Sequence, residues 1–280
     1  MIYISTGLMK ISFQEIINKS KKFNIKNFEL SGGTYEKNKI KKIFDLKDQF
    51  NFVLHNYFPA PLKPFTMNLA SLDDNIFYKT LNFIEKNINH SHKIGSKYYS
   101  LHAGFLIDPK PKELGRKIKL QKINDEETSE KRYLKGLYKI SKIAKEKNIE
   151  ILVENNVLTK KNLNTFSANP LMMVSTNQSL KLLQKFPNNV NMLVDLGHLK
   201  VSSKTLNFSP EVYLKKCQKW IKGYQLSDNN GVEDQNKFLT KKTWFLPFIK
   251  KNLDYYSLEL NCINFKKLKS QINLLKGCIQ

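Results

Sequence analysis

The chain has 280 residues, 41% of them hydrophobic, and its 47 lysines and arginines against 24 acidic residues give a formal net charge of +23. This length suits one large domain, which we expect to span residues 1–280. The sequence has neither the roughly 18 consecutive apolar residues of a membrane helix nor a signal-peptide pattern at its start, so it predicts a cytoplasmic protein without membrane attachment. Three cysteines without a close pair argue against a disulfide framework.

The positive charge is nearly all lysine, because Arg116 and Arg132 are the only arginines. Arginine is the side chain that forks onto phosphates and guanines, whereas the lysines are spread along predicted helix surfaces. Diffuse charge supports only weak, salt-sensitive association with nucleic acid. We therefore do not expect nucleic acid to be the partner.

Strand-like and helix-like segments alternate eight times along the chain. The predicted strands lie at residues 2–7, 27–31, 52–55, 98–102, 151–154, 192–195, 223–231 with its turn, and 257–261. The predicted helices lie at residues 12–23, 35–49, 71–95, 129–148, 177–186, from 209 onward, 243–252 and 265–278. Ser12 and Glu15 have the spacing of a capping box at the first helix, and Pro210 occupies a first helical position.

This alternation predicts an α/β protein, a single (β/α)8 TIM barrel. The connections after the fourth and fifth strands, residues 106–128 and 155–175, are longer than usual. Long loops on the active face of such barrels often act as lids, and these two are our candidates for substrate specificity. In the second strand Glu29 and Ser31 alternate with apolar neighbours, so one of them is expected to face the barrel interior.

Five predicted strands end in a residue that can bind a metal, namely His55, His102, Glu154, Asp195 and Glu259. The carboxyl ends of barrel strands converge on one face, so these side chains are expected to meet there. Carboxylates and imidazoles are common ligands of Zn, Mn and Fe, and buried carboxylates need such compensation. Taken alone, Asp195 would as readily cap the next turn and His198 be solvated. The repetition at five strand ends favours a metal centre.

Six short motifs resemble the xylose isomerase-like TIM-barrel superfamily, and the resemblance covers essentially the whole chain. They are Leu54-His55-Asn56, Leu101-His102-Ala103-Gly104, Val153-Glu154-Asn155, Val194-Asp195-Leu196-Gly197-His198, Leu226-Ser227-Asp228-Asn229 and Leu258-Glu259. The superfamily holds sugar and sugar-phosphate isomerases and epimerases, dehydratases, and the endonuclease IV class of DNA-repair enzymes.

The resemblance implies one divalent ion held by Glu154, Asp195, Gln225 and Glu259. Glutamine stands at 225 where the family usually has histidine. Its carbonyl oxygen is a poor zinc ligand, so Mn, Mg or Co is expected in preference to Zn. The implied activity is an isomerase or epimerase acting on a sugar, polyol or sugar phosphate. A proton would move through a metal-stabilised enediolate with Glu154 and Glu259 as acid and base, and lyase or dehydratase chemistry is a variant of it.

Other polar and aromatic residues are candidates for the substrate. His55, His102 and His198 match histidines of the endonuclease relatives and are expected to bind a second metal or the substrate. The expected substrate contacts are Asn56, Tyr57, Phe58, Asn155 and Asp228, although the aromatic loop after His55 is as readily explained by plain packing and Asp228 by orienting Gln225.

Two alternatives and one open point remain. An endonuclease IV-like phosphodiesterase acting on abasic DNA would need more histidines, because Asn236 stands where the second residue of an Asp-x-His pair belongs at 234–236. A barrel that has lost catalysis and serves as a binding subunit is favoured by Gln225. The sequence is also compatible with a homo-oligomer.

Overall fold

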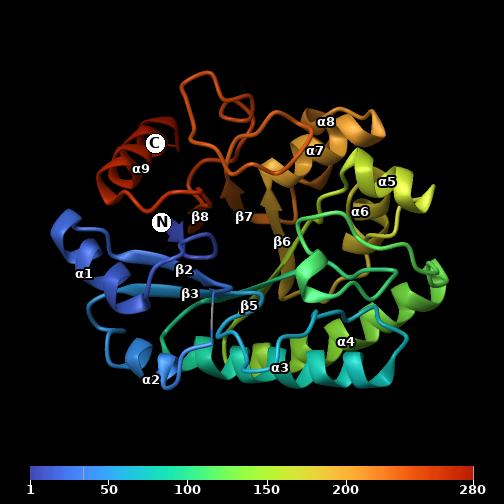
Figure 1. Ribbon diagram of the computed structural model, residues 1–280, viewed down its shortest axis with the longest axis horizontal. Coiled ribbons are helices and arrows are strands. Elements are labelled where there is room, and N and C mark those ends of the chain that lie inside the picture. Colours follow the sequence, from blue (N-terminus) through green and yellow to red (C-terminus); the bar gives the residue numbers. More distant parts are fainter. Residues whose placement is uncertain (34, 280) are drawn as a thin grey trace.

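The computed structural model describes residues 1–33 and 35–279, and its centre is a closed barrel of eight parallel strands (Figure 1). The strands are β1 (Ile2–Ser5), β2 (Asn27–Ser31), β3 (Asn51–His55), β4 (Tyr98–His102), β5 (Glu150–Glu154), β6 (Val190–Asp195), β7 (Ile221–Leu226) and β8 (Tyr255–Leu258). Neighbours in sequence are neighbours in the barrel, and β8 closes onto β1 with Ile4 opposite Leu258. The predicted (β/α)8 barrel is confirmed.

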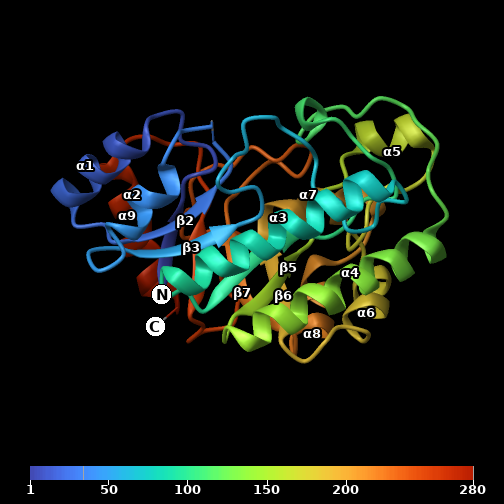
Figure 2. The same ribbon diagram turned by 90° about the horizontal axis from the view of Figure 1, so that it is seen from below.

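Helices surround the barrel, and α3 and α4 lie side by side along one flank (Figure 2). They are α1 (Phe13–Phe23), α2 (Lys39–Phe44), α3 (Asp74–Lys93), α4 (Glu126–Glu146), α5 (Lys160–Phe166), α6 (Thr176–Leu183), α7 (Leu196–Leu206), α8 (Pro210–Cys217) and α9 (Phe265–Ile279). Over residues 1–33 and 35–279, none of the helices has both the length and the apolar character to cross a membrane. The Ser12 hydroxyl accepts a hydrogen bond from the Glu15 N–H at 3.2 Å, as its capping position predicts.

Two helix predictions differ from the structure, and two of the helices were not predicted. Residues 243–252 form turns and no helix, because Pro247 lacks the N–H that a helix interior needs and its ring would clash with the preceding turn. The helix expected over 35–49 is confined to α2, which follows Asn38 in a left-handed conformation with φ of 62°. Helix α7 was not predicted and begins directly after Asp195, and α5 lies inside the long connection after β5.

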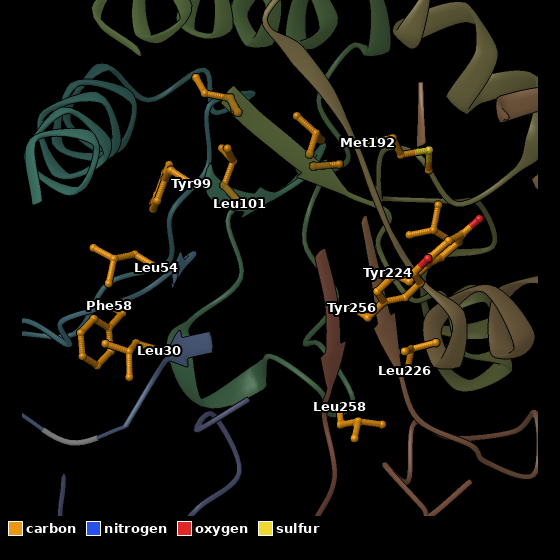
Figure 3. Close-up of a cluster of buried hydrophobic side chains, with 14 of the residues drawn as sticks. Leu30, Leu54, Phe58, Tyr99, Leu101, Met192, Tyr224, Leu226, Tyr256 and Leu258 are labelled. Carbon is orange, nitrogen blue, oxygen red and sulfur yellow. The ribbon is translucent and has the colours of Figure 1, made fainter. Parts of the chain in front are cut away.

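The strands alternate between an apolar outer face and a largely polar inner face. Leu30, Leu54, Leu101, Leu226 and Leu258 belong to the large core between barrel and helices (Figure 3). Inside the barrel a separate apolar cluster forms a floor, made of Tyr3, Val53, Tyr98, Leu152, Leu193 and Tyr255. Tyr98 and Tyr255 stack at 5.7 Å between ring centroids. Five of the six, all except Tyr3, precede a predicted metal-binding residue on or just after their own strand, so the floor closes the barrel below these residues.

The two long connections pack against each other. We call residues 106–125, between β4 and α4, the first insertion, and residues 155–175, between β5 and α6, the second insertion. The Asn162 side chain joins them, because its Nδ2 donates to the Arg116 carbonyl at 3.0 Å and its Oδ1 accepts from the Ile118 N–H at 3.0 Å. Ile118 also packs with Leu158 and Phe166 in one apolar cluster.

Replacing Asn162 by alanine is expected to separate the insertions. The change leaves the buried Ile118 N–H without its acceptor, which costs about 1–3 kcal/mol of stability. Limited proteolysis should then cut the first insertion sooner than in the wild type. Asn164→Ala, two residues along the same helix, is the control. Equal protease resistance in the wild type and Asn162→Ala would show that the apolar cluster alone holds the insertions.

Candidate metal centre

Glu154, at the end of β5, lies among three imidazoles and is 1% exposed. Its Oε2 is 3.3 Å from His55 Nε2. Its Oε1 is 3.5 Å from His102 Nδ1 and 3.0 Å from His198 Nδ1. The barrel therefore brings together residues that are far apart in the sequence, because they all stand at the carboxyl ends of parallel strands or one turn beyond.

Asp195 ends β6 and also caps α7. Its Oδ1 accepts a hydrogen bond of 2.6 Å from the backbone N–H of His198, whose imidazole lies against Glu154. Asn155 holds this strand end in position, since its side chain both accepts from the Asp195 N–H at 2.9 Å and donates to the Asp195 carbonyl at 3.1 Å. The other carboxylate oxygen, Asp195 Oδ2, is buried without a hydrogen-bond partner among the described residues.

Gln225 lies opposite Asp195 on the neighbouring strand β7 and is fully buried. Its Nε2 donates to Glu29 Oε1 at 3.0 Å, and its carbonyl oxygen has no hydrogen-bond partner in the described part of the chain. Glu29 is itself 0% exposed and was the inward-facing residue that the alternation in β2 allowed. The partner of Gln225 is thus Glu29 and not Asp228, which instead binds Lys200 Nζ at 2.6 Å.

A chain of hydrogen bonds continues from Glu29 across the barrel. Glu29 Oε2 accepts from the Tyr255 hydroxyl at 2.6 Å. That hydroxyl is 3.2 Å from Ser100 Oγ, which in turn lies 2.9 Å from His55 Nδ1. Because Nδ1 of His55 contacts Ser100, the other ring nitrogen, Nε2, faces Glu154. Sequence reasoning missed Glu29, Ser100 and Tyr255 as parts of the site, because they meet only through the barrel register.

Replacing Tyr255 by phenylalanine tests this chain. The change leaves the buried Glu29 carboxylate with one donor fewer, and we expect a loss of about 1–3 kcal/mol in the free energy of unfolding, measured by urea titration. Tyr3→Phe is the matched control, since Tyr3 belongs to the same floor but its hydroxyl contacts only Met1 Sδ, at 3.9 Å, among the described residues. Equal losses in the two variants would argue against a role for the hydroxyl.

Burial and the neighbouring histidines shift the pKa of Glu154 in opposite directions. Burial by itself raises the pKa of Glu154, but the charges of His102, His198 and His55 outweigh it and lower that pKa to about 2. Burial lowers the pKa of His102 to about 4, although the Glu154 charge acts against the shift. Glu154 is therefore a carboxylate, with electron pairs free for a cation.

The negative charges of Asp195, Asp234 and Glu259 repel one another. Burial, reinforced by the charges of Asp234 and Glu154, raises the pKa of Asp195 to about 7. Burial together with the charge of Asp195 and its acidic neighbours raises the pKa of Glu259 well above its usual range. Burial acts to lower the pKa of His198, but Asp195 and Asp234 outweigh it and raise that pKa well above the ordinary value. A divalent cation would relieve this repulsion.

Two sets of side chains offer ligand atoms within 4.8 Å of one another, His55 with His102 and Glu154, and Glu154 with Asp195 and His198. Glu154 belongs to both. One oxygen each of Asp195 and Gln225 has no hydrogen-bond partner within the described ranges, and such oxygens are ligands that Mn, Mg and Co accept. The residues present therefore fit a divalent ion.

A cavity of about 1050 Å³ adjoins these residues. Asn56, Tyr57, His102 and His198 line it, together with both insertions. Tyr57 also stacks on Phe83 at 5.5 Å between centroids, so the aromatic loop serves both the wall and the packing. Phe58 is 1% exposed in the core and does not line the cavity.

The loop after β7 also reaches the cavity. Asp234 Oδ2 is 3.4 Å from His198 Nε2, although sequence reasoning had named Asp234 only as the first member of an incomplete Asp-x-His pair. Asn236, which stands in the histidine's place, lines the same cavity. Asp234 thus belongs to the acidic cluster, although it lies in a loop and does not end a predicted strand.

Comparison with known proteins agrees with this architecture. A profile of the xylose isomerase-like TIM barrel family matches residues 16–276. The chain belongs to this family. No curated protein matches it by sequence.

Solved structures share the fold at low sequence identity. A D-tagatose 3-epimerase-like protein has a TM-score of 0.72 and 18% identity, covering 100% of this chain and 99% of its own. The D-psicose 3-epimerase of Clostridium cellulolyticum, solved with D-tagatose, has a TM-score of 0.70 and 12% identity, with 100% and 99% coverage. A Thermus thermophilus protein soaked with ZnCl2 has a TM-score of 0.66 and 14% identity, with 99% and 97% coverage.

Proposed function

We propose that this member of the xylose isomerase-like family is a metal-dependent isomerase or epimerase acting on a sugar, polyol or sugar phosphate. The observation that carries the proposal is a pair of buried oxygens on adjacent strands, Asp195 Oδ2 and Gln225 Oε1, which have no partner among residues 1–33 and 35–279. Asp195 also lies close to the Glu154 carboxylate. Buried polar atoms without partners are costly unless a ligand satisfies them. The epimerases among the similar structures support the same reaction class.

Glu154, Asp195, Gln225 and Glu259 would hold the ion, which we expect to be Mn, Mg or Co. When bound, it supplies Lewis-acid stabilisation of negative charge on substrate oxygens. His55 and His102 would hold a second ion with Glu154 or bind substrate hydroxyls. The chain's own part in the chemistry is proton transfer by Glu154 and Glu259, from opposite sides of the substrate.

The surroundings of these two carboxylates suit that task. His55, His102 and His198 hold Glu154 in place, so the carboxylate is positioned before substrate arrives. Glu259 follows β8, and its backbone N–H donates to the Leu226 carbonyl at 3.2 Å. The cavity, which His102 and His198 line, has room for a sugar, with Asn56 and Tyr57 on its wall. A catalytic acid or base works when it reaches its proton at roughly 2.6–3.2 Å.

A second candidate, an endonuclease IV-like phosphodiesterase, is favoured by one specific observation. Glu154 is shared between two possible ligand sets, and Asp234 approaches His198, so the cluster has donors for more than one ion. Against it, Gln225 and Asn236 replace two histidines. This candidate predicts tight Zn binding and cleavage of an oligonucleotide with an abasic site.

The test is metal-dependent proton exchange. Protein freed of metal by a chelator is incubated in D2O with a panel of ketoses, aldoses and their phosphates, with Mn, Mg, Co or Zn added. We expect deuterium to enter the carbon next to the carbonyl of one class of substrate, and only with metal present. No exchange with any metal, together with cleavage of the abasic oligonucleotide, would replace this proposal by the second candidate. If neither proton exchange nor cleavage of the oligonucleotide is found, the result would favour the non-catalytic binding subunit.

A further inference from the structure

Four basic residues of the two insertions line the cavity, and we call them its basic wall. They are Arg116 and Lys117 of the first insertion and Lys160 and Lys161 of the second. His102 and His198 of the candidate metal centre line the same cavity, and we call this part its metal-binding end. Glu233 and Asp234 are the acidic residues of the lining.

The four cations are brought together by the Asn162 bridge. Asn162 binds the backbone at Arg116 and Ile118, so the basic pairs 116–117 and 160–161 stand on adjacent segments of chain. None of the four side chains forms an ion pair with an acidic group in the part of the chain that the structure describes. Like charges that form no ion pair repel one another, and an anion in the cavity would offset that repulsion.

The presence of Arg116 distinguishes the basic wall from the lysine-rich surface of the rest of the protein. Only two of the 47 basic residues are arginine, and Arg132 has a structural role, pairing with Asp74 and packing over the Phe77 ring at 3.9 Å. Arg116 lines the cavity. A planar guanidinium binds phosphate oxygens through two parallel hydrogen bonds, whereas lysine acts as a point charge.

We propose that Arg116, Lys117, Lys160 and Lys161 form a subsite for the phosphate monoester of a small-molecule substrate. This inference rests on the proposed function and narrows its substrate class from sugars in general to sugar or polyol phosphates. The phosphate lies against the basic wall, and the polyhydroxyl part extends toward the metal-binding end. A cavity of about 1050 Å³ leaves room for both parts, since it is at the upper end of the roughly 300–1,000 Å³ of small-molecule sites.

The first experiment needs no activity. Inorganic phosphate is titrated calorimetrically into full-length, chelator-treated protein at low ionic strength, so that no metal competes for the anion. The double variant R116A/K160A is compared with K119A/K122A, which removes the same charge from exposed residues that do not line the cavity. We expect phosphate to bind the wild type and the control alike, and R116A/K160A to bind it roughly tenfold or more weakly, as expected when charge-assisted hydrogen bonds are lost.

Three results would overturn the subsite. They are no phosphate binding by the wild type, an equal loss in both double variants, and binding of an abasic oligonucleotide in place of phosphate. Because this titration uses metal-free protein, it decides the subsite even if no isomerase activity exists. If activity is found, R116A/K160A should raise KM for the phosphorylated substrate with little change in kcat, and should leave turnover of the free sugar unaltered.

Discussion

Replacing Glu259 by glutamine is expected to abolish metal binding while leaving the metal-free protein at least as stable as the wild type. In the metal-free site Glu259 is partly buried close to the charges of Asp195, Glu29 and Glu154, and desolvation together with these charges raises its pKa well above the usual range. A neutral amide of nearly the same shape removes part of that repulsion. A purely structural role for Glu259 predicts the opposite sign, a loss of stability without metal.

Metal should stabilise only the wild type. A ligand present at 100 times its Kd adds about 2.7 kcal/mol to the free energy of unfolding. For domains of 150–250 residues this corresponds to a rise of roughly 5–10 °C in Tm. Thermal unfolding with and without Mn, Mg, Co or Zn, together with metal analysis of protein purified without chelator, measures the effect. In Glu259→Gln the shift should vanish, and the deuterium exchange should fall by about 10²–10⁴-fold, the usual contribution of a general acid or base.

Asp195→Asn and Glu146→Gln complete the set. Asparagine is as good a helix N-cap as aspartate, so Asp195→Asn should keep the start of α7 and still lose the metal-induced shift. Glu146→Gln removes the same charge from an exposed position on α4 and should behave as the wild type. A metal-induced Tm shift that survives in both Glu259→Gln and Asp195→Asn would refute the proposed ligand set.

The barrel was predictable from sequence because its determinants are local. Most of the buried strands are short apolar runs, four of them end in His, Asp or Glu, and Glu259 directly follows a fifth. Local patterns also explain the errors. The run from Thr243 to Asn252 has helical composition, but Pro247 interrupts it. Helix α7 was not predicted because capping by Asp195 and metal binding by Asp195 were treated as alternatives, whereas one carboxylate oxygen caps the helix and the other stays unpartnered among the described residues.

The inner hydrogen-bond chain was beyond sequence reasoning. Gln225 and Glu29 lie 196 residues apart, and Tyr255 and Glu29 lie 226 apart. Their contacts depend on the shear of a closed barrel, which no single-strand pattern encodes. The alternation in β2 showed only that Glu29 or Ser31 faces inward. Phe58 was misplaced for a related reason, since its proline-rich loop does not reveal which of two adjacent aromatic residues enters the core.

Replacing Gln225 by histidine is expected to shift the metal preference toward Zn. The glutamine uses its N–H to satisfy the buried Glu29, and its oxygen has no partner among the described residues. A neutral imidazole offers the same combination, one N–H donor and one free electron pair, but the free atom is nitrogen, which Zn prefers over an amide oxygen. We expect Zn affinity relative to Mn to rise roughly tenfold or more, on the scale by which changes around a metal site move affinity.

Gln225→Leu separates the two roles of this side chain. Leucine keeps most of the volume but supplies neither donor nor ligand, so Glu29 is left with the Tyr255 hydroxyl. We expect metal-free Gln225→Leu to lose about 1.5–3 kcal/mol of stability, the usual worth of a hydrogen bond to a charged group, and metal-free Gln225→His to lose much less. Competition between Zn and Mn for each metal-free protein gives the preference. If Gln225→His leaves that preference unchanged while Gln225→Leu is destabilised, Gln225 only supports Glu29, and the ion must be held by the carboxylates and histidines alone.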